Sequence, residues 1–119
     1  MPNDRSALGR AGEDAAAAFL TARGWQVLAR NVRRREGEVD IVARRGSTLA
    51  FVEVKTRRTT AYGTPGEAVT YRKRSRIRGI AAAMLAEGIT RASVVRFDVI
   101  EARPGRDGAF AIHHIEAAF

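Results

Sequence analysis

Apolar residues recur at helical spacing in two segments of the chain. The first segment runs from Ser6, a suitable N-cap residue, to about Ala22. The second begins at the capping-box sequence 64–67, or restarts at Thr70, and its apolar stripe continues to Glu87. The spacing therefore predicts two helices, each with one face against a core.

Short stretches rich in Val and Ile lie between and after these helices. They predict five strands, at residues 25–32, 38–44, 48–55, 93–101 and 109–115. Polar turn sequences at 33–37 and 104–108 separate strands that follow each other directly. The order predicts an α/β fold with a central mixed sheet of about five strands, flanked by two main helices. With 119 residues and no linker or repeat, the chain is expected to form one domain, residues 1–119.

The second and third strands form the most informative hairpin. Gly46-Ser47 suits a two-residue type II′ turn, and counting back from it places Asp40 opposite Glu53. Lys55 shares the face of Glu53, because side chains two residues apart on a strand point the same way. The other face carries core residues, namely Val39, Ile41, Ala43, Ala50, Val52 and Val54. The register therefore predicts an Asp, a Glu and a Lys in one place.

The facing carboxylates of Asp40 and Glu53 need a compensating cation, because like charges directly opposite each other destabilise a hairpin. Carboxylate oxygens, in a chain without cysteine, suit Mg²⁺ or Mn²⁺. Such an ion can activate water for the hydrolysis of phosphodiesters. The alternative is a solvated strand face on which Lys55 forms a cross-strand ion pair with Glu38.

Two residues on the predicted helices extend this candidate site. Glu13 shares a helix face with Gly9, Ala16 and Leu20. Gly9 and Gly12 are expected to let this helix lie close to a neighbouring element. Lys73 extends the apolar stripe of the second helix by one turn. The alternatives are a carboxylate that only stabilises the helix dipole and a lysine that reaches past the core to water.

The charge balance favours a polyanionic partner. There are 21 Lys and Arg residues against 13 Asp and Glu, a net charge of +8, and only Lys55 and Lys73 are lysine. No apolar run approaches the ~18 residues of a membrane span, and residues 1–5 lack the apolar core of a signal peptide, so we expect a cytoplasmic protein. The candidate nucleic-acid-binding residues are Arg33, Arg34, Arg35, Arg57, Arg58, Arg72, Lys73, Arg74 and Arg76.

The chain also carries an ordered set of short motifs: Gly12-Glu13, Gly37-Glu38-Val39-Asp40, Phe51-Val52-Glu53-Val54-Lys55-Thr56-Arg57, Lys73 and Arg96-Phe97-Asp98-Val99. In order and spacing they resemble the YraN-like bacterial proteins. That family of predicted endonucleases is grouped with the PD-(D/E)xK restriction-endonuclease-like superfamily, near the archaeal Holliday-junction resolvases. The resemblance covers the chain from about Leu8 onward and implies a restriction-endonuclease-like fold.

The resemblance also implies roles for individual residues. Asp40 and Glu53 match the metal-binding acids and Lys55 the motif lysine. Glu13 and Lys73 match the first-helix acid and the second-helix basic position of the catalytic set. The implied activity is Mg²⁺- or Mn²⁺-dependent cleavage of nucleic acid, with DNA favoured over RNA, branched or damaged structures as candidate substrates and a homodimer as a candidate assembly.

A second hypothesis is a non-catalytic nucleic-acid-binding module that retains the nuclease fold. The arginines serve either function, since both need phosphate neutralisation. Metal binding at Asp40 and Glu53 separates the two, because a pure binding module does not need paired acids. A membrane-surface or protein-interaction domain is disfavoured, since no basic amphipathic helix stands free of the predicted core.

Overall fold

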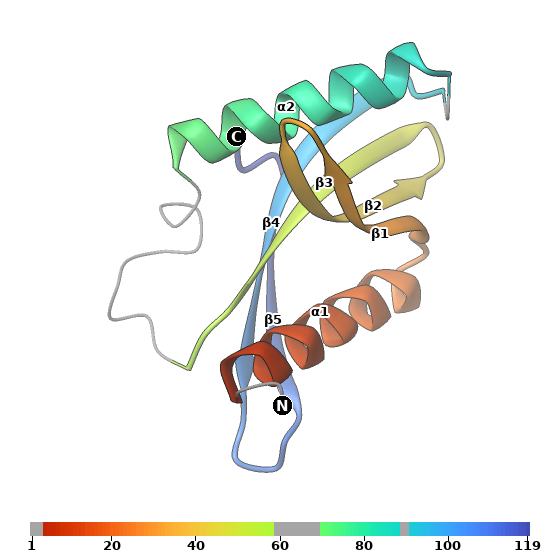
Figure 1. Cartoon of the computed structure of the whole chain (residues 1–119). Helices are drawn as coiled ribbons and strands as arrows, with labels where there is room; N and C mark the ends of the chain where they lie inside the picture. The colour runs from red at the N-terminus through yellow and green to blue at the C-terminus, as the bar shows by residue number, and fades with distance from the viewer. Residues whose placement is uncertain (1–3, 59–69, 89–90) are drawn as a thin grey trace.

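A single mixed sheet runs through the computed structural model, which describes residues 4–58, 70–88 and 91–119 (Figure 1). The elements in chain order are α1 (Asp4–Ala22), β1 (Gln26–Arg34), β2 (Gly37–Arg45), β3 (Thr48–Thr56), α2 (Tyr71–Ala86), β4 (Val94–Pro104) and β5 (Phe110–Ile115). The strands lie side by side in that order, and only β3 and β4 are parallel. A parallel pair needs a long crossover, and the segment that contains α2 supplies it. The α/β fold class and the element order αβββαββ are confirmed, and the architecture is consistent with the restriction-endonuclease-like fold.

The two helices cover opposite faces of the sheet (Figure 1). On the α1 face, one apolar cluster comprises Ala16, Leu20, Trp25, Ile41, Ala43, Ala50, Val52 and Ile100. On the α2 face, a second cluster comprises Val39, Val42, Leu49, Phe51, Ile77, Ile80, Ala81 and Met84. The central strands are therefore buried on both sides, which explains their nearly continuous Val, Ile and Ala sequence.

The helix boundaries correct one prediction and settle another. Because α1 begins at Asp4, Ser6 lies inside the helix, and its predicted role as N-cap is wrong. α2 begins after Thr70, whose Oγ1 accepts a hydrogen bond from the Lys73 backbone N–H at 3.2 Å. The restart at Thr70 is thus confirmed, whereas the capping box 64–67 lies outside the described residues.

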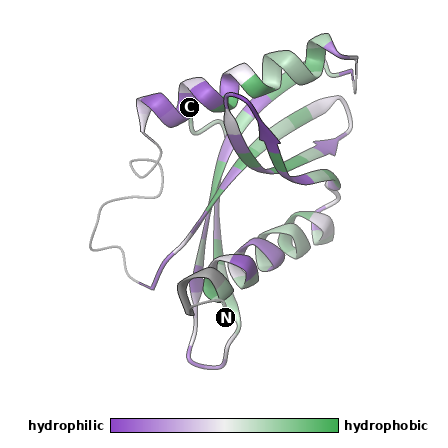
Figure 2. Cartoon of the chain, viewed as in Figure 1, coloured by the Kyte–Doolittle hydropathy of each residue, from purple (hydrophilic) through white to green (hydrophobic). Residues whose placement is uncertain are grey.

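The two halves of α2 differ in polarity. Its first half is hydrophilic and its second half is apolar (Figure 2). The buried residues Ile77, Ile80, Ala81 and Met84 belong to the second half and to its junction with the first. α2 is therefore anchored by its C-terminal part, while its N-terminal part presents basic side chains. In the described part of the chain, no helix is long and apolar enough to cross a membrane.

The first hairpin is longer than its polarity suggests. Arg33 and Arg34 were expected in a turn, but they belong to β1 and pair with Glu38 and Gly37 of β2. Opposite charges across this hairpin favour the pairing, with Arg33 Nε 3.6 Å from Glu38 Oε2. The run of charged residues concealed the strand because it interrupts the alternation of apolar and polar positions.

The hairpin of β2 and β3 has the predicted register over most of its length. Gly46 has a φ of +59°, as the first central residue of a type II′ turn requires. The β2–β3 ladder runs from this turn to the pair Ile41–Val52. There it stops, one pair short of Asp40 and Glu53. Beyond this point Val39 packs with the α2 cluster instead of with Ile41, so its predicted face is wrong. The regular alternation of β2 breaks at Asp40.

Candidate active site

The carboxylate of Asp40 lies at the point where β2 and β3 separate. Its Oδ2 accepts a hydrogen bond from the Val54 backbone N–H at 2.8 Å. Because the ladder has ended at Val52, Val54 has no described backbone partner on β2, and the Asp40 side chain supplies the acceptor instead. This bond fixes the carboxylate at the fork between the two strands.

Glu53 lies beside Asp40 at this fork. Its side chain is only 4% exposed, and its carboxyl group is close enough to share a hydrogen bond with that of Asp40. Burial, together with repulsion from Glu53, raises the pKa of Asp40 to about 7. The predicted juxtaposition of the two acids is present, although the strands diverge where direct opposition was expected. Repulsion between like charges gives a physical reason for that divergence.

The only two lysines of the chain both contact Glu53. Lys73 forms an ion pair with Glu53 Oε1, and the Nζ of Lys55 lies 3.6 Å from the same oxygen. Burial and the neighbouring Lys73 lower the pKa of Lys55. Burial would also lower the pKa of Lys73, but its hydrogen bond and attraction to Glu53 outweigh this effect and raise it. The alternative pair of Lys55 with Glu38 is not formed, since Glu38 pairs with Arg33.

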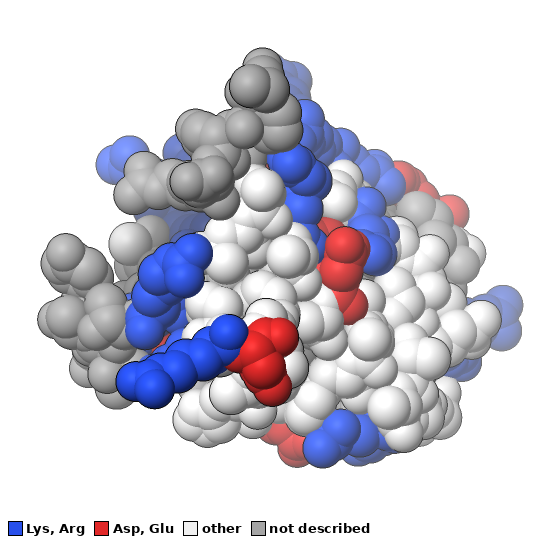
Figure 3. Space-filling model, turned by 90° about the horizontal axis from the view of Figure 1, so that it is seen from below, with Lys and Arg blue, Asp and Glu red and all other residues white. Residues whose placement is uncertain are grey.

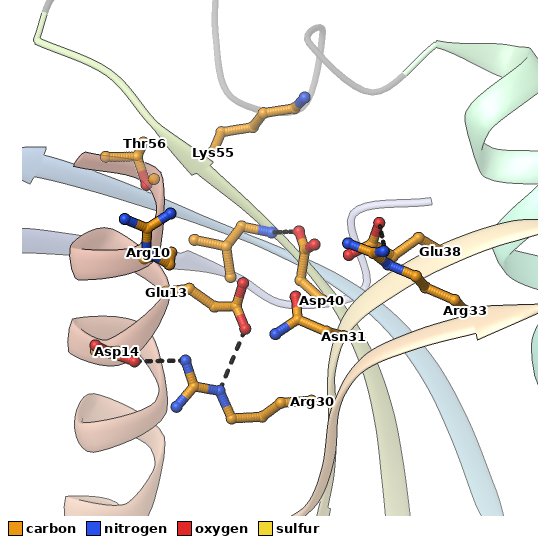
Figure 4. Close-up of a pocket in the computed structure, with 12 residues that line it drawn as sticks. Arg10, Glu13, Asp14, Arg30, Asn31, Arg33, Glu38, Asp40, Lys55 and Thr56 are labelled. Carbon is orange, nitrogen blue, oxygen red and sulfur yellow. Dashed lines mark hydrogen bonds and ion pairs between the residues drawn. The ribbon is translucent and has the colours of Figure 1, made fainter. Parts of the chain in front are cut away.

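Glu13 borders the site from α1 and is held by a different partner. Its Oε1 lies 3.2 Å from Arg30 Nε, and Arg30 also pairs with Asp14 at 2.6 Å (Figure 4). The Glu13 charge still contributes to the raised pKa of Asp40. Glu13 is therefore a neighbour of the acid pair.

Gly12 allows α1 to approach the end of β3 closely. A Cβ atom at Gly12 would collide with the side chain of Thr56, so only glycine fits this contact. Gly9, by contrast, has nothing within 4 Å of a Cβ position, and its predicted role in close packing is wrong. The glycine of the Gly12-Glu13 motif thus brings Glu13 toward the acid pair.

Asp40 borders two pockets, one on each side of the fork. The pocket next to α1 has a volume of about 780 Å³ and is lined by Arg10, Glu13, Arg30, Glu38, Asp40 and Lys55, among others (Figure 4). The pocket next to α2 has a volume of about 380 Å³, and its lining includes Asp40, Glu53, Thr70, Arg72, Lys73 and Arg76. A ligand in either pocket reaches the carboxylate of Asp40.

The donor set at the fork fits a hard divalent cation. Two adjacent carboxylates offer oxygen ligands, and a cation would relieve the repulsion that raises the pKa of Asp40. Among residues 4–58, 70–88 and 91–119, no group of three or more acidic, His or Cys side chains gathers to hold a metal. Mg²⁺ commonly uses only one or two carboxylates and fills its remaining positions with water and substrate oxygens. Asp40 and Glu53 would hold such an ion.

The predicted nucleic-acid-binding residues fall into two groups. Arg34 and Arg57 are committed to ion pairs, with Glu87 and Glu101 respectively, and Arg33 has a weaker contact with Glu38. The exposed members are Arg33, Arg35, Arg58, Arg72 and Arg76, whereas Lys73 and Arg74 are half-buried. Seen from below, basic side chains are spread around the surface, with acidic side chains between them (Figure 3). The surface therefore offers several separate basic contacts.

The sequence reasoning missed a buried cluster on β4 and β5. Asp98 is fully buried and accepts hydrogen bonds from Arg96 Nε at 3.0 Å, Arg96 Nη2 at 2.9 Å and the Ala117 N–H at 2.9 Å. The Nε2 of His114 lies 2.7 Å from its Oδ2. An Arg and an Asp two residues apart on a strand were the available signal. The position of His114 beside Asp98 depends on the register of β4 with β5, and the Arg–Asp spacing gives no information about that register.

Comparison with known proteins gives a consistent result. Residues 12–102 match the model of the uncharacterised protein family UPF0102. A UPF0102 protein of Symbiobacterium thermophilum is 52% identical over 112 residues, which are 94% of this chain and 95% of that protein. A UPF0102 protein of Rhodococcus opacus is 50% identical, with 95% and 96% covered. One from Nocardia farcinica is 47% identical, with 98% and 91% covered. These names give a family and no activity.

Proposed function

The chain belongs to the uncharacterised protein family UPF0102, the YraN-like family, and we propose that it is a metal-dependent endonuclease that hydrolyses phosphodiester bonds in DNA. The observation that carries the proposal is the pair of adjacent carboxylates, Asp40 and Glu53, at the fork of the sheet. Both lysines of the chain converge on the same place. A structural ion-pair network does not need two adjacent acids, one of which has its pKa raised to about 7 by burial and by repulsion from the other.

Asp40 and Glu53 are the proposed ligands of Mg²⁺ or Mn²⁺. When bound there, the ion would lower the pKa of a water molecule and neutralise charge on the phosphate. The protein contributes the position of the two carboxylates. The Val54 N–H fixes Asp40, and burial of Glu53 keeps its side chain from moving freely.

The two lysines have different proposed roles. The lowered pKa of Lys55 makes the neutral amine, which can accept a proton, easier to form than in an exposed lysine, so Lys55 is suited to orient and deprotonate water. Lys73, whose pKa is raised, keeps its charge and is suited to neutralise a phosphate oxygen beside Glu53. Glu13, paired with Arg30, is a third acid, at the rim of the site.

The basic N-terminal half of α2 is the proposed first contact with DNA. Arg72, Lys73 and Arg76 line the pocket next to Glu53, so a backbone phosphate bound there would lie at the acid pair. The net charge of +8 supports attraction to a polyanion. A preference for branched or damaged DNA, and a homodimeric assembly, stay predictions that rest on the resemblance to junction resolvases.

The test is a cleavage screen on single-stranded, duplex, flapped and four-way-junction DNA with Mg²⁺, with Mn²⁺ and with EDTA. We expect metal-dependent cleavage of at least one substrate, and a loss of at least 100-fold in Asp40→Asn and Glu53→Gln, because each removes a metal ligand. Lys55→Met should lower the rate while metal binding persists. The matched control is Glu116→Gln, which removes an exposed acid that follows β5 and contacts Arg96, and which should leave the rate unchanged.

Binding of Mg²⁺ or Mn²⁺ by calorimetry gives a readout that does not depend on turnover. Wild type should bind one ion that Asp40→Asn does not bind. If wild type binds DNA but binds neither ion, with or without DNA, the non-catalytic binding module replaces the nuclease. The ion pair of Lys73 with Glu53 is the observation that favours this second candidate, because it already neutralises one acid.

A further inference from the structure

A polar strip continues from the acid pair along the face of the sheet that α2 leaves uncovered. β3 and β4 extend well below α2 (Figure 1). Lys55 and Arg57 share the face of Glu53 because they follow it at intervals of two residues. The parallel register places Glu101 of β4 beside Lys55, and Arg103 follows on the same face. The strip consists of Lys55, Arg57, Glu101 and Arg103.

Glu101 holds two arginines in this strip. Its Oε2 accepts hydrogen bonds from Arg57 Nε at 3.2 Å and Nη2 at 3.1 Å, and its Oε1 accepts one from Arg103 Nη2 at 2.7 Å. The Glu101 side chain is only 6% exposed, whereas that of Arg103 is 40% exposed. The carboxylate lies beneath the guanidinium groups and fixes their positions, so little side-chain freedom would be lost when they bind an anion.

The number of arginines that contact each acid distinguishes this cluster from the ion pairs of Arg30. Between α1 and β1, one arginine, Arg30, meets two acids, Glu13 and Asp14. In the strip, Arg57 and Arg103 both contact one acid, Glu101, and Arg57 has a further contact besides. Arg103 uses one of its five N–H donors on Glu101, and its buried Nε has no hydrogen-bond partner within the described ranges. Donor capacity is therefore left over on Arg103, whose side chain is 40% exposed.

We propose that Arg57 and Arg103 bind a backbone phosphate of the DNA strand at a second position, away from the reacting phosphate. Arg57 lies four residues beyond Glu53, about 13 Å along the strand. The bound strand would run from the acid pair, past Lys55, to the two arginines, and Glu101 is the positioning residue that orients them. The inference rests on the proposed function for the nature of the ligand, but it concerns binding rather than chemistry.

The test measures the affinity for a fluorescein-labelled single-stranded DNA by anisotropy between 50 and 200 mM salt, with EDTA present so that nothing is cleaved. Arg103→Gln should weaken binding roughly fivefold at 0.1 M salt and reduce the slope of log affinity against log salt by ~0.7, the value of one phosphate contact. The matched control is Arg23→Gln, which removes the same charge just after α1, from a guanidinium group that stacks on the Phe19 ring. The control should leave the slope unchanged. Equal effects of the two substitutions would overturn the proposal.

Glu101→Gln separates positioning from simple charge. The substitution raises the net charge from +8 to +9, so a purely electrostatic surface would bind DNA more tightly. If Glu101 orients the two arginines, Glu101→Gln weakens binding instead, and tighter binding would contradict that role. Should this variant not fold, as judged by circular dichroism, Arg103→Gln alone decides the proposal. If wild type cleaves DNA but Arg103→Gln and Arg23→Gln have the same DNA affinity and salt dependence, only the second phosphate site is refuted. If wild type neither binds nor cleaves any substrate, the proposed function itself is refuted.

Discussion

Two aspartates in the same sheet, the buried Asp98 and the half-buried Asp40, have opposite electrostatic environments. Asp98 on β4 accepts hydrogen bonds from an arginine, a backbone N–H and the His114 ring, and these lower its pKa although burial alone would raise it. Asp40 on β2 accepts one backbone N–H and lies beside Glu53, and its pKa is raised to about 7. Asp98 is fully removed from water and Asp40 partly so, but only Asp98 receives full compensation from the protein.

This difference distinguishes a structural carboxylate from one that fits an external ligand. The Asp98 cluster ties the C-terminal residues to β4 through Ala117 and His114, and it leaves no charge unpaired. At the Asp40 site, the carboxylate lies beside a second carboxylate, at the point where the strands separate and where two pockets meet. A cation from solution would reduce the repulsion between Asp40 and Glu53, whereas the hydrogen bonds around Asp98 already compensate its charge.

The largest expected effect comes from making the same substitution at both positions. Asp98→Asn should destabilise the protein by about 3–5 kcal/mol, because it leaves Arg96 and the buried hydrogen bonds without their anion. Asp40→Asn in EDTA should leave stability unchanged or raise it, because it removes a repulsion. Urea unfolding followed by circular dichroism measures both free energies. Similar losses in the two variants would mean that Asp40 is also structural.

The second expected effect is an opposite pH dependence at the two sites. The folded-state pKa of Asp40 lies above its unfolded value, so the folded protein holds more protons and its stability falls as pH rises from about 4 through about 7. The folded-state pKa of Asp98 is lowered, so its contribution is present above its unfolded pKa and is lost as pH falls through the folded value.

Unfolding of metal-free wild type and Asp40→Asn at several pH values tests the predicted direction of the pH dependence at Asp40. The stability of wild type relative to Asp40→Asn should fall by about 2–3 kcal/mol between pH 4 and pH 8. Excess Mg²⁺ should remove most of this fall in wild type, because the cation favours the charged carboxylate. A difference between the proteins that does not change with pH would refute the raised pKa of Asp40.

The sequence predicted the parts of this comparison that depend on local spacing. Gly46-Ser47 fixed the register of β2 with β3, and that register brought Asp40 near Glu53 and Lys55 near both. Lys73 was found because it continues an apolar helical stripe with a charged residue. Each of these inferences needs only a turn type or a helical period, and both are properties of short segments.

The remaining features depend on contacts between distant segments. The end of the β2–β3 ladder at Val52 follows from a carboxylate that takes the Val54 N–H, which strand alternation does not reveal. Glu13 pairs with Arg30 because α1 packs beside β1. The Asp98 cluster requires the register of β4 with β5, and that register depends on the length of their connecting turn.

The smallest expected effect is that of substituting His114, and it tests whether the imidazole helps to compensate the buried charge of Asp98. Its Nε2 lies 2.7 Å from Asp98 Oδ2, and its ring packs edge-on against Phe19 with centroids 6.2 Å apart. His114→Leu should cost about 1.5–3 kcal/mol, because it removes a donor from a buried charge. His114→Gln keeps an amide N–H that can replace the donor, and it should cost about 1 kcal/mol. The neighbouring His113→Gln is the control, since that exposed side chain lies on the other face and should change stability by no more than about 0.5 kcal/mol. If His114→Leu unfolds at the same urea concentration as wild type, Arg96 and the Ala117 N–H alone satisfy Asp98, and the imidazole is not part of its compensation.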